Sequence, residues 1–162
     1  MATTEESTFN ERGLLFSVYA SGHLYVFLWC LARWFMYNDS AFMCIPLALV
    51  SLGGAIDNYR LLKGAVIGKS GMSMSLTTVT YLFHMAGLPL LWITISDIIG
   101  TMFDQNWISV IGRVLGITLC VYGFNELMID VMGNYVPTDE AGVWRYKLEP
   151  SKVSNHAFTK SF

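Results

Sequence analysis

Four long apolar runs divide this chain, and they constrain its fold more than any other feature of the sequence. A helix needs about 20 mostly apolar residues to cross the hydrocarbon core of a bilayer. The runs cover residues 13–37, 41–62, 74–102 and 107–132 of a 162-residue chain. We therefore predict an all-α integral-membrane protein, with a four-helix transmembrane domain over residues 1–136 and a polar cytoplasmic tail over residues 137–162.

The composition agrees with a chain that is mostly out of water. Only 14% of its residues are charged and 54% are hydrophobic, whereas a soluble domain carries roughly a quarter charged residues. The net charge of −2 gives no electrostatic reason to expect nucleic acid as a partner. The three cysteines lie inside apolar runs without a CxxC pair, which is typical of packing rather than redox chemistry.

The connections between the runs predict the topology. They cover only residues 38–40, 63–73 and 103–106, and such short links favour antiparallel neighbours in an up-down-up-down four-helix bundle. Eight of the ten Lys and Arg residues then fall on the side of the two termini, and only Arg33 and Arg113 fall on the other. Because positive charge collects on the cytoplasmic side, both termini are expected in the cytoplasm of a multi-pass membrane protein.

Ionisable residues inside the predicted spans give the strongest functional signal. Each costs on the order of 2.5–3.5 kcal/mol even on lenient insertion scales, so such residues usually mark a function. One from each run falls at a similar depth, within a slab of roughly 10 Å at 1.5 Å rise per residue. These four are the candidate catalytic residues: His23, Asp57, His84 and Glu126. We expect them to line one cavity open toward the side of the termini.

Further polar residues surround this slab and are candidates for substrate binding: Asn58, Arg60, Tyr81, Asn125 and Asp130. Arg60 is expected to pair with Asp57, Glu126 or Asp130, because an unpaired guanidinium at that depth would be costly. The alternative is that these buried pairs only fix the register of the helices. Near the opposite ends of the helices, Asp97 and Arg113 are expected to pair with each other or to extend toward the interface.

Glycine and proline positions add weaker expectations. Gly54–Asp57 and Gly123–Glu126 share a glycine followed after three residues by a carboxylate, which allows a chain built from two pseudo-equivalent helix hairpins. Pro89 is expected to kink the third helix. Gly112 and Gly116 form a GxxxG pattern, which allows helices to approach closely and is weak evidence for a homo-oligomer.

Three functions fit these features. The first is a small membrane enzyme that acts on a lipophilic small molecule by general acid/base chemistry, in a cyclisation, isomerisation or elimination, all of which need proton placement in a dry pocket. The second is a transporter or channel for protons, ions or small solutes, which with so few helices needs an oligomer. The third is a non-catalytic subunit or assembly factor of a membrane complex. The enzyme is slightly favoured.

No resident cofactor is expected, although His23 and His84 allow an alternative in which they bind haem or, with carboxylates, a metal ion. In the tail, Trp144 and Tyr146 alternate with charged residues. We expect a solvated, partly disordered segment there, or alternatively one that rests on the membrane surface or on a partner.

Overall fold

The computed structural model describes residues 2–130 and 135–148, and the side chains of residues 11–87, 89–125 and 135–147. Four long helices account for most of the described chain: α1 (Ala2–Tyr37), α2 (Ala41–Val66), α3 (Met74–Met102) and α4 (Asn106–Asp130). Each contains a stretch that is long and apolar enough to cross a membrane. The predicted apolar runs are therefore helices, and the chain has the features of a multi-pass membrane protein.

Two of the helices extend beyond the apolar runs that predicted them. α1 begins at Ala2 rather than at Gly13, and α2 continues to Val66 rather than ending at Leu62. An apolar run shows only which part of a helix can lie in lipid. The helix itself continues into water until a helix-breaking residue ends it. The added part of α2 ends beside Gly68, whose φ of 71° is readily adopted by glycine. A 3-10 turn, η1 (Gly68–Gly71), then leads to α3.

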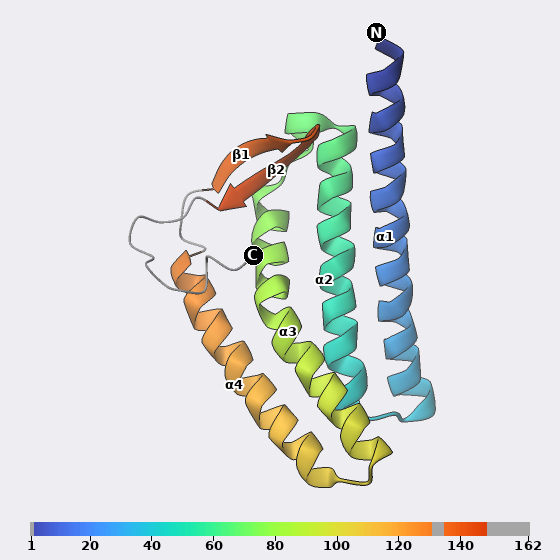
Figure 1. Cartoon of the computed structure of the whole chain (residues 1–162), viewed down its shortest axis with the longest axis vertical. Coiled ribbons are helices and arrows are strands. Elements are labelled where there is room, and N and C mark those ends of the chain that lie inside the picture. The colour runs from blue at the N-terminus through green and yellow to red at the C-terminus, as the bar shows by residue number, and fades with distance from the viewer. Residues whose placement is uncertain (1, 131–134, 149–162) are drawn as a thin grey trace.

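The helices lie side by side in chain order, with α1 packed on α2, α2 on α3 and α3 on α4. Figure 1 shows the α1–α2 and α3–α4 connections at one end, and the N-terminus with η1 at the other. Figure 1 also shows α4 leaning away from α3 toward the end that carries η1. The axes of α3 and α4 thus diverge toward the end that carries η1.

Small residues set the contact between α3 and α4. Gly112 packs against Ser96, and Gly116 packs against Ile93 and the carbonyl of Pro89, so closely that neither glycine leaves room for a Cβ. Both glycines of the GxxxG pattern thus serve packing within the chain. α3 continues through Pro89, so this proline does not end the helix.

A β-hairpin follows the fourth helix. β1 (Tyr135–Glu140) pairs antiparallel with β2 (Val143–Leu148). Ala141 and Gly142 form the turn with φ of 53° and 81°, as the tight turns of two-residue hairpins require. This hairpin lies where the sequence predicts a solvated tail from Pro137 onward.

The hairpin packs on the ends of α2 and α3 and on η1. Gly64 of α2 lies directly against the carbonyl group of Trp144, with no space for a side chain between them. Lys69 places its ammonium group 5.7 Å from the centre of the Trp144 ring, and the rings of Tyr135 and Tyr81 lie 6.0 Å apart. The hairpin therefore covers the end of the α2–α3 pair nearest to the polar slab (Figure 1).

Candidate functional site

An ion pair inside α2 forms the centre of the candidate site. Arg60 donates from Nη2 to Oδ1 of Asp57 at 2.8 Å and from Nε to the same oxygen at 3.3 Å. The two residues are one turn apart on the helix, so they share a face. Their side chains are only 10% and 19% exposed. The predicted ion pair of Arg60 therefore forms, and its partner is the carboxylate on its own helix.

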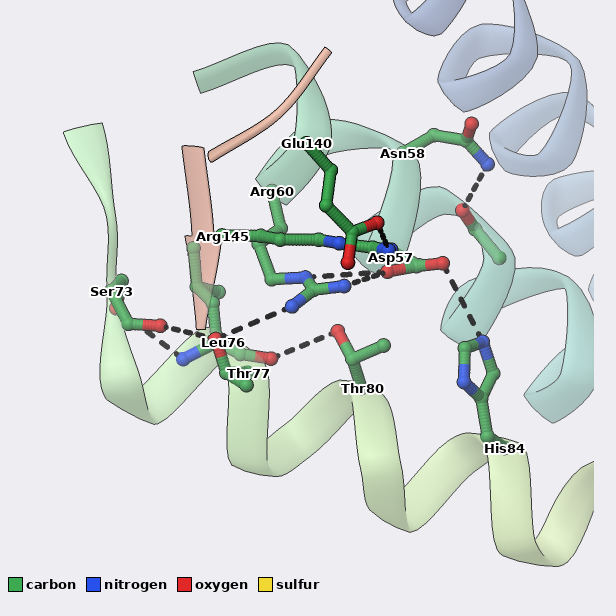
Figure 2. Close-up of polar contacts among 11 residues, drawn as sticks. Asp57, Asn58, Arg60, Ser73, Leu76, Thr77, Thr80, His84, Glu140 and Arg145 are labelled. Carbon is green, nitrogen blue, oxygen red and sulfur yellow. Dashed lines mark hydrogen bonds and ion pairs between the residues drawn. The ribbon is translucent and has the colours of Figure 1, made fainter. Parts of the chain in front are cut away.

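Two threonines of α3 close the other side of this pair (Figure 2). Thr77 and Thr80 are buried and stand one turn apart on the face of α3 that meets α2. Their hydroxyls donate to carbonyls of their own helix, Ser73 and Leu76, at 2.9 Å each. The oxygen of Thr77 is then left to accept from Nη1 of Arg60 at 3.5 Å. A buried guanidinium is thereby held by a carboxylate and by a hydroxyl.

The second oxygen of Asp57 faces a histidine on α3. Nε2 of His84 lies 3.5 Å from Oδ2 of Asp57, at the limit of a hydrogen bond. Figure 2 shows the imidazole directed at the carboxylate from one side and the guanidinium of Arg60 from the other. The His84 side chain is 57% exposed. The arrangement is a fixed carboxylate that orients a histidine whose far edge is accessible.

His23 and Asn58 lie next to this group without joining it. The imidazole of His23 packs on Gly54, where an added Cβ would come within 2.9 Å of three ring atoms. Gly54 precedes Asp57 by one turn, which brings His23 to the neighbouring part of α2. The amide of Asn58 donates to the Gly54 carbonyl at 2.8 Å and points away from Asp57 (Figure 2). The amide of Asn58 is thus engaged by its own helix.

The remaining predicted site residues lie elsewhere or outside the description. Asn125 lines a separate hollow of about 320 Å³ between α3 and α4, together with apolar residues such as Met85 and Phe124. Tyr81 lies beneath Tyr135 of the hairpin. The side chains of Glu126 and Asp130 lie outside the described residues. Asp57 and His84 therefore meet, whereas a single cavity lined by His23, Asp57, His84 and Glu126 stays a prediction.

Residues of the hairpin, which are not among the predicted site residues, lie over this site. Glu140 of β1 pairs with Arg145 and, at 3.2 Å, with Lys147, both on β2. Figure 2 shows Arg145 extending from its strand toward Asp57 and Arg60. The signal was present in the alternation from Trp144 onward, which is typical of a strand, but a run of this length was read as a polar tail.

A second buried ion pair lies at the opposite end of the helices and provides an internal comparison. Asp97 of α3 is 2% exposed. It accepts from Nε of Arg113 at 3.1 Å and from the hydroxyl of Ser40 at 2.7 Å. The Arg113 guanidinium also lies 4.0 Å above the Phe42 ring. The predicted pairing of Asp97 with Arg113 is confirmed, and these contacts tie α2, α3 and α4 together; the Arg113 side chain is 30% exposed, about half as much as that of His84.

His23 and His84 approach α2 at different residues. His23 contacts α2 at Gly54, whereas His84 contacts it at Asp57. Within the described part of the chain, no three His, Cys, Asp or Glu side chains are grouped as ligands of one ion. The haem and metal alternatives therefore gain no support from the described residues.

Comparison with known proteins returned no match to a protein family, to a curated protein or to a solved structure. The function must therefore be argued from the residues and their geometry, because fold alone does not specify function.

Proposed function

We propose that this protein is an integral-membrane enzyme that moves a proton on a lipophilic small molecule, with His84 as the proton-transfer group. It crosses the bilayer four times as an up-down-up-down bundle with both termini in the cytoplasm. The observation that carries the proposal is the chain of contacts from Arg60 through Asp57 to His84. This chain of contacts ends on the exposed imidazole of His84. His84 lies about 15 Å along α3 from Met74, at 1.5 Å rise per residue.

Each of the three residues has a distinct task. Arg60 fixes one oxygen of Asp57, so the other oxygen is held in place for the imidazole. A histidine whose Nε2–H is bound by a carboxylate presents Nδ1 as an acceptor, which makes that nitrogen the base. Since Asp57 is occupied on both oxygens, we assign the transferred proton to His84 rather than to the carboxylate.

An isomerisation is the simplest reaction for such a site. Nδ1 removes a proton from a carbon of the substrate, the electrons of that C–H bond shift along an adjacent double bond, and the proton returns at the far carbon. Atoms and charge balance without an added reactant. A positioned acid/base group accelerates such steps by about 10²–10⁴-fold, and an apolar surrounding limits side reactions with water. Cyclisation and elimination use the same proton transfer.

A non-catalytic subunit is the second candidate, and the exposure of α1 favours it. Only 6% of the membrane-spanning window of this helix is buried within the chain, and large side chains such as Tyr25 and Trp29 are exposed along it. These residues would contact either lipid or a partner helix. In this alternative the Asp57–Arg60 pair fixes helix register, and His84 has no chemical task.

The test is purification in mild detergent followed by mass spectrometry of the lipophilic molecules that co-purify. We expect the wild-type protein to carry a pair of related molecules, substrate and product, that differ in structure or by a small eliminated group. The variant His84→Gln should carry the substrate alone. Identical molecules in identical ratios on both folded proteins would contradict the enzyme and favour the subunit.

A further inference from the structure

Arg145 has a feature that its ion pair does not explain. Its guanidinium binds Glu140, yet its Nε is buried and finds no acceptor among the described residues. Buried N–H groups nearly always have a partner, so each exception calls for a reason. Figure 2 shows this side chain directed from β2 toward Asp57 and Arg60. The donor is thus buried on the side of the candidate site.

The charges around this donor favour an anion. Three cations, Arg60, Arg145 and Lys147, share two carboxylates, because Asp57 binds the first and Glu140 binds the other two. Among the described side chains, one positive charge is left over in this group. Guanidinium groups bind carboxylates and phosphates with directed, charge-assisted hydrogen bonds. An anionic oxygen would satisfy the donor and balance the charge together.

The position of the hairpin indicates how such a molecule would lie. The hairpin covers the end of α2 and α3 that carries η1 (Figure 1), and its Trp144 carbonyl packs on Gly64. The imidazole of His84, by contrast, is exposed along the flank of α3. Since the helices are proposed to span a bilayer, an imidazole about 15 Å along α3 from Met74 is reached from within the bilayer rather than from the water above the hairpin.

We propose that Arg145 binds the anionic head, a carboxylate or phosphate, of a single-chain amphiphile whose apolar chain extends past His84 into the bilayer. This inference rests on the proposed function and narrows its substrate class. Arg145 is then a specificity-determining residue contributed by the hairpin.

Photoreactive long-chain probes test this inference on the full-length protein in phosphatidylcholine vesicles. The probes share one chain and carry a carboxylate, an alcohol or an amine as the head. We expect the carboxylate probe to label α3 about tenfold more than the other two, as one charge-assisted hydrogen bond allows. An excess of acetate should not compete, because it lacks the chain. Displacement of the carboxylate probe by acetate would show a site for free anions and would overturn the proposal that the ligand is an amphiphile.

Two variants assign the preference to Nε of Arg145. Arg145→Lys keeps a cation for Glu140, so the hairpin pairing survives, but it lacks the Nε–H; the preference for the carboxylate probe should be lost. Lys147→Gln is the matched control, because Lys147 is exposed on the same strand and binds the same Glu140; it should keep the preference. Equal labelling by all three probes, or a preference retained in Arg145→Lys, would overturn the proposal.

His84→Gln separates this inference from the proposed function. The variant should keep the carboxylate preference while it loses conversion, because His84 is assigned to the proton and not to the head. If the preference holds but His84→Gln converts the co-purified molecule normally, the head site stands and the enzymatic role of His84 is wrong.

Discussion

His84 on α3 and Asp57 on α2 approach each other to 3.5 Å between Nε2 and Oδ2, and the two residues differ sharply in exposure. The carboxylate is mostly buried and held from its other side by Arg60, whereas the imidazole is more than half exposed. Because Asp57 is fixed and buried while His84 is accessible, replacing the two residues should affect activity and stability differently.

Replacing His84 by Gln should reduce activity without unfolding the protein. Gln retains a polar side chain but cannot act as a base, so conversion of the co-purified molecule should fall about a hundredfold or more. The side chain is 57% exposed, and therefore the melting temperature should change little. Mass spectrometry gives the conversion and a thermal melt in detergent gives the stability. A large fall in both together would instead point to a structural role.

Replacing Asp57 by Asn should reduce both stability and activity. The change leaves the buried guanidinium of Arg60 without a counter-charge, which costs about 3–5 kcal/mol for a buried pair. The double variant Asp57→Asn/Arg60→Met removes both charges, so its stability should recover. Its activity should stay low because His84 has lost its orienting carboxylate. Recovery of activity along with stability would contradict the role given to Asp57.

Asp97→Asn provides the comparison at the other end of the helices. Asp97 is buried between Arg113 and Ser40, so loss of its charge should lower the melting temperature by an amount similar to that for Asp57→Asn. Conversion per folded molecule should stay near the wild-type value, because Asp97 lies at the opposite end of the helices from His84. A selective loss of conversion in a stable Asp97→Asn protein would move the site to this end.

The glycines of α4 should be required for folding rather than for self-association. An added methyl at Gly112 would collide with Ser96 of α3, so Gly112→Ala should cost about 1–3 kcal/mol by overpacking. Gly22→Ala on α1 is the matched control, because a Cβ there meets nothing within 4 Å in the described part of the chain. A change in oligomeric state without loss of stability in Gly112→Ala would support the dimer that the GxxxG pattern allows.

The helices and part of the site could be predicted from the length of the apolar runs and from the position of each residue along its run. Apolar length gives the number of helices and their approximate ends, and residue number gives the depth of a side chain along its helix. Depth placed Asp57 and His84 within one slab of roughly 10 Å, and these two residues do meet. Depth carries no information on rotation about the helix axis, so it could not show that Asn58 binds its own helix or that Asn125 lies in another hollow.

The hairpin could not be predicted in the same way. The hairpin packs on parts of the chain that are far away in the sequence, as the Trp144 carbonyl does on Gly64. A run of alternating residues is a weak signal by itself, because an isolated hairpin is at best marginally stable in water. The position of Arg145 beside the candidate site therefore follows from the folded hairpin and not from the sequence pattern.

Chemical rescue is the measurement that tests the central claim most directly. His84→Ala removes the imidazole and leaves space beside Asp57 that free imidazole can enter, because the native side chain is 57% exposed. We predict that His84→Ala converts the co-purified molecule at least about a hundredfold more slowly, and that added imidazole restores conversion in proportion to its concentration. A folded His84→Ala protein that converts at the wild-type rate, or that stays inactive at every imidazole concentration, would contradict proton transfer by His84.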